Sequence, residues 1–219
     1  MAGIGYGYGL EEISHAQMLG IPLTADDANA ARRAYEEFVD RVALQGDASK
    51  GFSGFFNYPG VTAGSAVTGD WGTATADQIL ADVNTALSLQ AAGTLYTSFA
   101  DTLLLPYDKF LMIATRKVNE QGLESILTYL QKNNIYTAQT GRPLTIRGLI
   151  GLNTAGAGGT ARMISYRRDP MVLKMHIPMP HRFLPVWQAG PIRWEVPGIF
   201  RLGGVDIRRP AEVRYTDGI

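Results

Sequence analysis

Cysteine is absent from the sequence, and its absence excludes disulfide-stabilised folds, thiolate zinc sites and cysteine nucleophiles. An excess of charge is also lacking, because 20 Lys and Arg side chains balance 20 Asp and Glu side chains. A protein that reads a nucleic-acid sequence usually has a basic excess, so this class is disfavoured. A net charge near zero also removes one barrier to association between copies.

Neither a membrane span nor a signal peptide is evident. The apolar run 103–114 is interrupted by Pro106, Asp108 and Lys109, so it does not resemble a membrane helix. The first residues lack the basic segment and apolar core of a secretory signal. We therefore expect a soluble protein that is made inside the cell and does not associate with a membrane.

Motifs that carry chemistry are missing as well. The glycine-rich stretch 151–160 has no Lys-Ser/Thr pair after it and therefore does not match a phosphate-binding loop. In the segment 51–55, Phe55 occupies the position where a nucleophile elbow needs a second glycine. His176 and His181 are separated by a spacing that suits neither one helix face nor one strand face. The sequence predicts no catalytic residue, no metal and no cofactor.

The composition is otherwise that of a globular protein with many turns. Apolar residues make up 46% and charged residues 18%, a balance that does not favour disorder. The 25 glycines and 11 prolines indicate turns and close backbone approaches. Residues 2–9 alternate glycine with tyrosine, which we interpret as the end of an extended arm. We expect the natural protein to have further residues before this arm.

The strongest local pattern predicts one long helix. Thr24 can cap its N-terminus, and the acidic residues that follow suit the positive end of the helix dipole. Apolar residues then recur at steps of three and four up to Val42, and Gly46 is a plausible stop. Such a helix of about 21 residues would be roughly 30 Å long. This length is typical of a helix that spans a whole molecule.

The remaining patterns mix helices and strands without strict alternation, which predicts an α+β fold. Thr75 and Gln78 form a capping-box pattern before a helix that ends near Gly93. Pro106 is placed to open a third helix, and residues 123–132 form a fourth. The expected strands are 102–105, 144–152, 162–166, 172–177, 192–196, 199–202 and 205–207.

The C-terminal region combines arginines with large aromatic residues. These residue types are enriched at protein–protein interfaces. Surface arginines that simply balance nearby acidic residues, with aromatic side chains in the core, are the alternative interpretation. The candidate subunit-interface residues are Arg193, Trp194, Arg201, Arg208, Arg209 and Arg214.

Several motifs occur in an order that resembles a prophage-associated family of major capsid proteins with the Hong Kong 97 fold. Near the N-terminus, Glu11-Glu-Ile-Ser14 precedes Gly20-Ile-Pro-Leu23, the long helix, and Asn57-Tyr-Pro-Gly60. Near the C-terminus the strings are Met179-Pro-His-Arg-Phe-Leu-Pro-Val-Trp187, Trp194-Glu-Val-Pro197, Phe200-Arg-Leu-Gly-Gly-Val205, Ile207-Arg-Arg-Pro210 and Val213-Arg-Tyr-Thr-Asp-Gly218.

The resemblance implies a peripheral domain of residues 1–60 plus 162–219, with a spine helix at about 25–45, and an axial domain of residues 61–161. It implies a structural subunit and not an enzyme. Many copies would self-assemble into pentamers and hexamers of an icosahedral capsid that encloses double-stranded DNA without sequence specificity. The implied partners are other copies, the packaged DNA, and scaffold or portal proteins. The protein would be made in the bacterial host cytoplasm and would reside in the virion.

Alternatives of other classes remain at this point. An encapsulin-like compartment would share the fold but would package enzymes. A hydrolase of unknown type and a small-ligand binding module are further alternatives, although no assembled nucleophile or ligand motif favours them. Lys50 and Asn57 are residue types that can form an isopeptide crosslink, but a surface lysine and a turn asparagine are the simpler interpretation.

Overall fold

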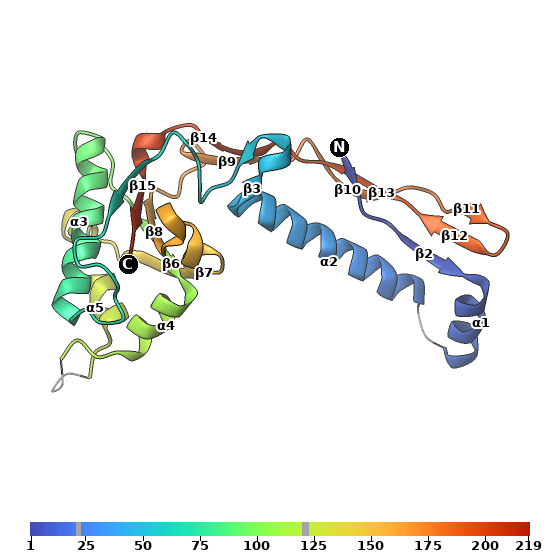
Figure 1. Cartoon of the computed structure of the whole chain (residues 1–219), viewed down its shortest axis with the longest axis horizontal. Helices are drawn as coiled ribbons and strands as arrows, with labels where there is room; N and C mark the ends of the chain where they lie inside the picture. Colours follow the sequence, from blue (N-terminus) through green and yellow to red (C-terminus); the bar gives the residue numbers. More distant parts are fainter. Residues whose placement is uncertain (21–22, 120–122) are drawn as a thin grey trace. The chain divides into compact units, whose positions relative to one another are not determined.

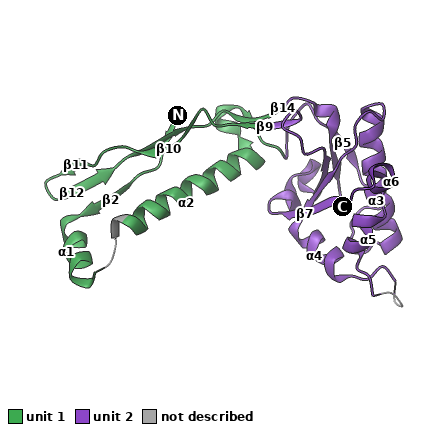
Figure 2. Cartoon of the chain, turned by 180° about the vertical axis from the view of Figure 1, so that it is seen from behind, with its two compact units in different colours: residues 1–55, 175–206 green, residues 56–174, 207–219 purple. Residues whose placement is uncertain are grey.

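The computed structural model describes residues 1–20, 23–119 and 123–219. The chain forms two compact units (Figure 2). Unit 1 contains residues 1–55 and 175–206, and unit 2 contains residues 56–174 and 207–219. The chain therefore passes from one unit to the other three times.

The longest helix of the described residues is α2 (Leu23–Leu44), in unit 1. The helix begins at Leu23, so Thr24 lies in its first turn. Its apolar face packs on Phe200, with ring centroids 4.9 Å from Tyr35 and 5.7 Å from Phe38. The predicted long helix is thus confirmed, and its buried face explains its stability. Within the predicted Gly20–Leu23 run, residues 21–22 lie outside the described part of the chain.

The other elements of unit 1 are short strands, the helix α1 and a 3-10 helix; β10 and β13 run alongside α2 in Figure 1, and α1 lies beyond the N-terminal end of α2. One three-stranded sheet has the order β1-β13-β10, and a second has the order β11-β12-β2. Two further short strands, β3 and β4, pair antiparallel. The bounds are β1 (Ala2–Gly3), β2 (Tyr6–Gly9), α1 (Leu10–Leu19), β3 (Gly46–Asp47), η1 (Ala48–Lys50), β4 (Phe52–Ser53), β10 (Met179–Phe183), β11 (Trp187–Gly190), β12 (Arg193–Val196) and β13 (Gly198–Arg201).

The alternation of glycine and tyrosine at the N-terminus has a steric cause. The Tyr6 ring contacts Phe183 at 5.4 Å, and the Tyr8 ring stacks on Trp194 at 6.4 Å. Just before Tyr6, a Cβ on Gly5 would lie 2.5 Å from the Val196 carbonyl oxygen, and between the tyrosines a Cβ on Gly7 would lie 3.1 Å from the Trp194 carbonyl oxygen. The segment is extended as predicted, and β2 is hydrogen-bonded to β12 along its length. Glycine is required where this segment approaches the main chain of its neighbour.

Unit 2 is built on a five-stranded sheet with the order β5-β15-β8-β6-β7. The pairs β5–β15 and β6–β7 are parallel, whereas β15–β8 and β8–β6 are antiparallel. The central strands β6 and β8 are buried at every residue, which fits their position between two neighbours. The bounds are β5 (Thr62–Ser65), β6 (Thr102–Pro106), β7 (Thr145–Leu149), β8 (Arg162–Tyr166) and β15 (Val213–Asp217).

Helices cover this sheet and complete one hydrophobic core around Trp71, Ile79 and Leu103. The capping box before α3 is confirmed, because Thr75 accepts the Gln78 N–H and Gln78 accepts the Thr75 N–H. The fourth predicted helix begins at Ile126, later than expected, because Ser125 caps it by accepting the Thr128 N–H. The bounds are α3 (Ala76–Gly93), α4 (Tyr107–Thr115), α5 (Ile126–Lys132) and α6 (Ile135–Thr140).

Two features differ from the sequence-based expectations. The strand expected at 144–152 ends at Leu149, because Leu152 begins the first of two short 3-10 helices, η2 (Leu152–Thr154) and η3 (Ala157–Gly159). In addition, the segment 162–219, which was predicted to belong to one domain, is divided between the units. The reason is that β8 and β15 pair with each other inside the unit 2 sheet. The remaining elements are β9 (Leu173–His176), β14 (Gly204–Ile207) and η4 (Pro210–Glu212).

Candidate subunit interface

Three of the six predicted interface residues lie in unit 1. Arg193 and Trp194 are on β12, where they pair with Gly9 and Tyr8 of β2. The Arg193 Nε atom lies 3.4 Å from a Glu195 carboxylate oxygen, and both side chains are largely exposed. Trp194 is half-buried against Tyr8. Arg201 ends β13 and is exposed. The two arginines are thus accessible to a partner, whereas Trp194 mainly packs against its own unit.

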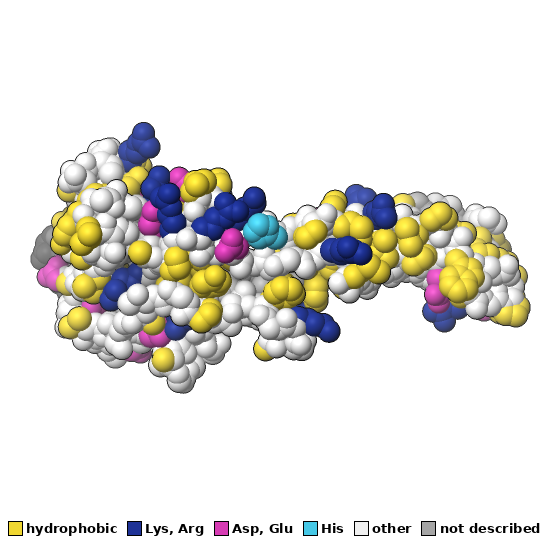
Figure 3. Space-filling model, turned by 90° about the horizontal axis from the view of Figure 1, so that it is seen from above, with side chains coloured by type: hydrophobic (Ala, Val, Ile, Leu, Met, Phe, Trp, Pro, Cys, Tyr) yellow, Lys and Arg dark blue, Asp and Glu magenta, His cyan; other side chains and the backbone are white. Residues whose placement is uncertain are grey.

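Arg208 and Arg209 lie in unit 2 and are both exposed. Glu212, which is buried, accepts a hydrogen bond from Arg209 Nη1 at 3.1 Å and another from Arg167 Nη1 at 3.4 Å. Two guanidinium groups are therefore held around one carboxylate. Figure 3 shows Lys and Arg side chains gathered on one face of this unit. Five basic residues of unit 2 lie on β9 or directly after β8 and β14, and we call them the arginine cluster: Arg167, Arg168, Lys174, Arg208 and Arg209.

Arg214 differs from the other predicted residues because its side chain is partly buried in unit 2. Burial lowers the pKa of its guanidinium. Its Nε atom is buried and has no hydrogen-bond partner within the described residues. A Cβ on Gly64 would lie only 2.9 Å from its Nη2 atom, so the side chain lies against β5. Three of the six predicted residues therefore lie in each unit, and Trp194 and Arg214 are less exposed than the other four.

An arginine that sequence reasoning missed organises the interior of unit 2. The Arg162 Nε and Nη2 atoms donate to the two Asp217 carboxylate oxygens at 2.6 and 2.8 Å. Its Nη1 atom donates to the Phe56 carbonyl oxygen, and its guanidinium lies 4.4 Å from the Tyr215 ring centroid. Asp217 also accepts the Ala157 N–H at 3.0 Å. The buried ion pair between Arg162 on β8 and Asp217 on β15 thus also binds the main chain of the glycine-rich stretch and of Phe56, the first residue of unit 2.

The Asp217 carboxyl shows how this network balances its charges. Burial raises its pKa, but the hydrogen bonds from Arg162 and from the Ala157 N–H outweigh burial, and the net pKa is lowered. The only sequence signal was an arginine directly before the apolar pair Met163 and Ile164 in a buried strand. Its partner is 55 residues away, so spacing could not identify it.

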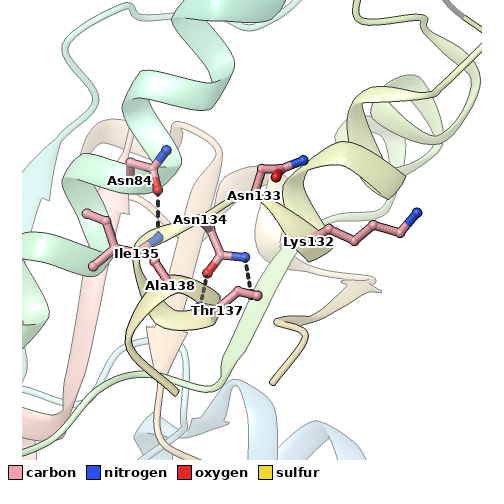
Figure 4. Close-up of a pocket in the computed structure, with 7 residues that line it drawn as sticks. All are labelled: Asn84, Lys132, Asn133, Asn134, Ile135, Thr137 and Ala138. Carbon is pink, nitrogen blue, oxygen red and sulfur yellow. Dashed lines mark hydrogen bonds between the residues drawn. The ribbon is translucent and has the colours of Figure 1, made fainter. Parts of the chain in front are cut away.

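A polar cavity of about 660 Å³ lies in unit 2 (Figure 4). Its amide groups are used within the fold. Asn84 accepts the Ile135 N–H at 3.2 Å, and Asn134 accepts the Thr137 N–H at 2.9 Å while donating to the Leu130 carbonyl at 2.7 Å. These hydrogen bonds fix the connection between α5 and α6. The lining residues are Asn84, Lys132, Asn133, Asn134, Ile135, Thr137 and Ala138.

Unit 1 exposes more apolar surface than its own packing uses. No residue of α1 is buried, and Met18 and Leu19 are 84% and 72% exposed. Trp187 on the β11–β12 hairpin is 66% exposed. An apolar groove of about 340 Å³ is lined by side chains that include Phe38, Phe52 and Leu202. Exposed apolar surface of this kind is typical of protein–protein contacts, and the sequence analysis did not identify it.

Two classes of site are not found in the part of the chain that the structure describes. Within residues 1–20, 23–119 and 123–219, no cluster of three His, Asp or Glu side chains could hold a metal ion. Among the same residues, no helix combines the length and the apolar character that crossing a bilayer requires.

The fold is similar to that of several solved capsid structures. The capsid of Myoviridae phage XM1 superposes with a TM-score of 0.82 at 20% identity, covering 100% of this chain and 72% of that chain. The empty GTA particle gives 0.60 at 12% identity, covering 99% and 72% of the two chains. A virus-like particle from Pyrococcus furiosus gives 0.59 at 12% identity, covering 99% and 77%. The chain therefore has the α+β fold of phage capsid proteins.

The family follows from the sequence itself. The model of the major capsid protein family matches residues 1–219, so the chain belongs to that family. No curated protein matches the chain. The predicted resemblance is confirmed, and the protein has a structural role as a subunit of an icosahedral capsid in the virion. This family favours neither the encapsulin-like compartment nor the hydrolase.

Proposed function

We propose that many copies of this chain associate into pentamers and hexamers, and that these close a shell around double-stranded DNA. The exposed apolar surface of unit 1 carries this proposal. A ten-residue helix such as α1 is marginal when it is isolated in water, and its own unit buries none of its residues. A neighbouring copy would cover this helix and would remove Met18 and Leu19 from water.

The two units support a division of labour within this proposal. Unit 1, with α2 as its spine helix, would be the peripheral part of each subunit, and unit 2 would be the axial part. Arg193 and Arg201 in unit 1, and Arg208 and Arg209 in unit 2, would contact neighbouring subunits, since all four are exposed. Packaged DNA, scaffold or portal proteins would be further partners, and synthesis would occur in the host cytoplasm.

The direct experiment is to purify the chain and follow its association by light scattering and electron microscopy as its concentration rises. Shells or rings are the expected result. Met18→Asp should reduce particle yield because it places a charge in the apolar contact, whereas Gln17→Asp, at an exposed polar neighbour, should leave yield unchanged. A chain that remains monomeric at every concentration would contradict the proposal.

A further inference from the structure

The zero net charge of the chain conceals an unequal division between the units. Unit 1 contains 7 Lys and Arg residues and 10 Asp and Glu residues, which gives a net charge of −3. Unit 2 contains 13 basic and 10 acidic residues, which gives a net charge of +3. Each copy therefore has one unit of net negative charge and one of net positive charge, and surfaces of opposite sign attract across an interface.

The acidic surface of unit 1 lies on α2. Five acidic and three basic residues occur on this helix. Glu37 is already paired with Arg33 at 3.1 Å, and Arg41 lies over the Phe38 ring. Glu36 and Asp40 are exposed, lie one helical turn apart, and have no ion-pair partner within the described residues. We call Glu36 and Asp40 the acidic pair.

The basic surface of unit 2 is the arginine cluster, and rigid elements hold it. The buried Glu212 carboxylate accepts hydrogen bonds from Arg167 and Arg209 and so limits the positions of both side chains. The Arg208 N–H donates to the Val172 carbonyl at 2.9 Å, so Arg208 and the nearby Lys174 project from hydrogen-bonded main chain. Guanidinium groups that are already positioned lose little conformational entropy when they bind a carboxylate. This surface is built to bind anionic groups.

We propose that the arginine cluster of one copy binds the acidic pair on α2 of a neighbouring copy. The inference rests on the proposed self-assembly and names two of the surfaces that meet. The two surfaces occur once each in every copy, so a head-to-tail contact between them can be repeated around a closed ring. A nucleic acid as the partner of the arginine cluster would leave the acidic surface of α2 without a role.

A charge exchange tests this contact. Lys174→Glu with Arg208→Glu makes two of the five positive side chains of the cluster negative and leaves Arg167, Glu212 and Arg209 intact. Glu36→Lys with Asp40→Lys reverses the charge of the acidic pair. Each pair of substitutions alone places like charges in the contact and should lower particle yield about tenfold or more. A chain that carries all four substitutions places the two new glutamates against the two new lysines and should recover particle yield.

Two controls separate this contact from general effects. Arg142→Glu with Arg147→Glu makes the same change of charge at exposed positions of unit 2 outside the cluster and should not change yield. Urea unfolding should show that every variant folds. The inference fails if the fourfold variant assembles no better than the two pairs, or if Lys174→Glu with Arg208→Glu assembles normally. It fails also if that pair loses only binding to double-stranded DNA. In each of these cases wild-type particles would leave the proposed capsid function standing.

Discussion

At the scale of single residues, the ion pair between Arg162 and Asp217 dominates unit 2. Both side chains are about nine-tenths buried, and Arg162 uses three of its nitrogen atoms in hydrogen bonds to Asp217 and Phe56. A buried ion pair contributes little net stability when compared with apolar residues, but the loss of one partner leaves an uncompensated charge. The pair therefore makes unit 2 sensitive to changes at either residue.

Replacing Asp217 with asparagine should strongly destabilise unit 2. Asp217→Asn keeps the shape of the side chain but leaves the Arg162 cation buried without its counter-charge. The expected loss is about 3–5 kcal/mol in the free energy of unfolding, measured by urea denaturation. Asp169→Asn, at a more exposed partner of Arg167, should cost about 1 kcal/mol or less. Equal losses of unfolding free energy for the two variants would contradict the claim that the buried Arg162 cation depends on Asp217 for its counter-charge.

The same pair should make stability fall in acid. The Asp217 pKa in the folded chain is below its usual value of 3.8, so the unfolded chain binds a proton first as the pH falls. The contribution of this carboxylate is complete above the unfolded pKa and is lost as the pH falls through the folded pKa. The urea midpoint of the wild type should drop between pH about 5 and about 2 more steeply than that of Asp217→Asn. Parallel curves for both chains would refute this assignment.

At the scale of elements, the sequence predicted those helices whose signals come from residues close together in the chain. The spacing of apolar residues identified α2, and the Thr75–Gln78 pair identified the start of α3, since both patterns act within a few turns. Strand pairing was not accessible in this way. β15 lies between β5 and β8 although about 150 residues separate it from β5 and about 50 from β8. The exposed apolar residues of α1 were missed because a local pattern does not show which side chains the rest of the unit leaves uncovered.

The N-terminal strand offers a matched test of an element. Gly5→Ala places a Cβ about 2.5 Å from the Val196 carbonyl oxygen, so the strand must shift. We expect a loss of about 1–3 kcal/mol in the free energy of unfolding of unit 1. In Gly9→Ala the nearest atom is 3.9 Å away, and the loss should stay within about 0.5 kcal/mol. The two variants would be compared by thermal unfolding, and a smaller loss for Gly5→Ala would contradict the steric explanation.

At the scale of the whole molecule, the net charge of the chain is zero, but the net charges of its two units are not. Composition alone gave the zero net charge, and only the assignment of residues to units revealed the −3 and +3. The interface arginines were predicted as one set, yet the fold places Arg193 and Arg201 in unit 1 and Arg208 and Arg209 in unit 2. Sequence reasoning could name these residues but could not group them, because grouping depends on the three passages between the units.

Assembly that uses these opposite charges should weaken in salt. Raising sodium chloride from about 0.1 M to about 1 M shortens the Debye length from about 10 Å to about 3 Å. The protein concentration at which particles first scatter light should therefore rise in the wild type. The chain in which the arginine cluster and the acidic pair are exchanged should respond in the same way, whereas either half-exchanged chain should improve with salt. An onset that does not change with salt would argue for purely apolar contacts.

The three passages of the chain between the units also set an order in time. A ribosome releases residues from the N-terminus onward, yet unit 1 needs the segment 175–206 to provide β10 to β13. Unit 2 waits even longer, because β15 must enter between β5 and β8 before the sheet is continuous. On a polysome, a nascent chain therefore has neither unit complete while it lies close to other nascent chains. Copies become competent to join a shell only after nearly all of this sequence has been translated.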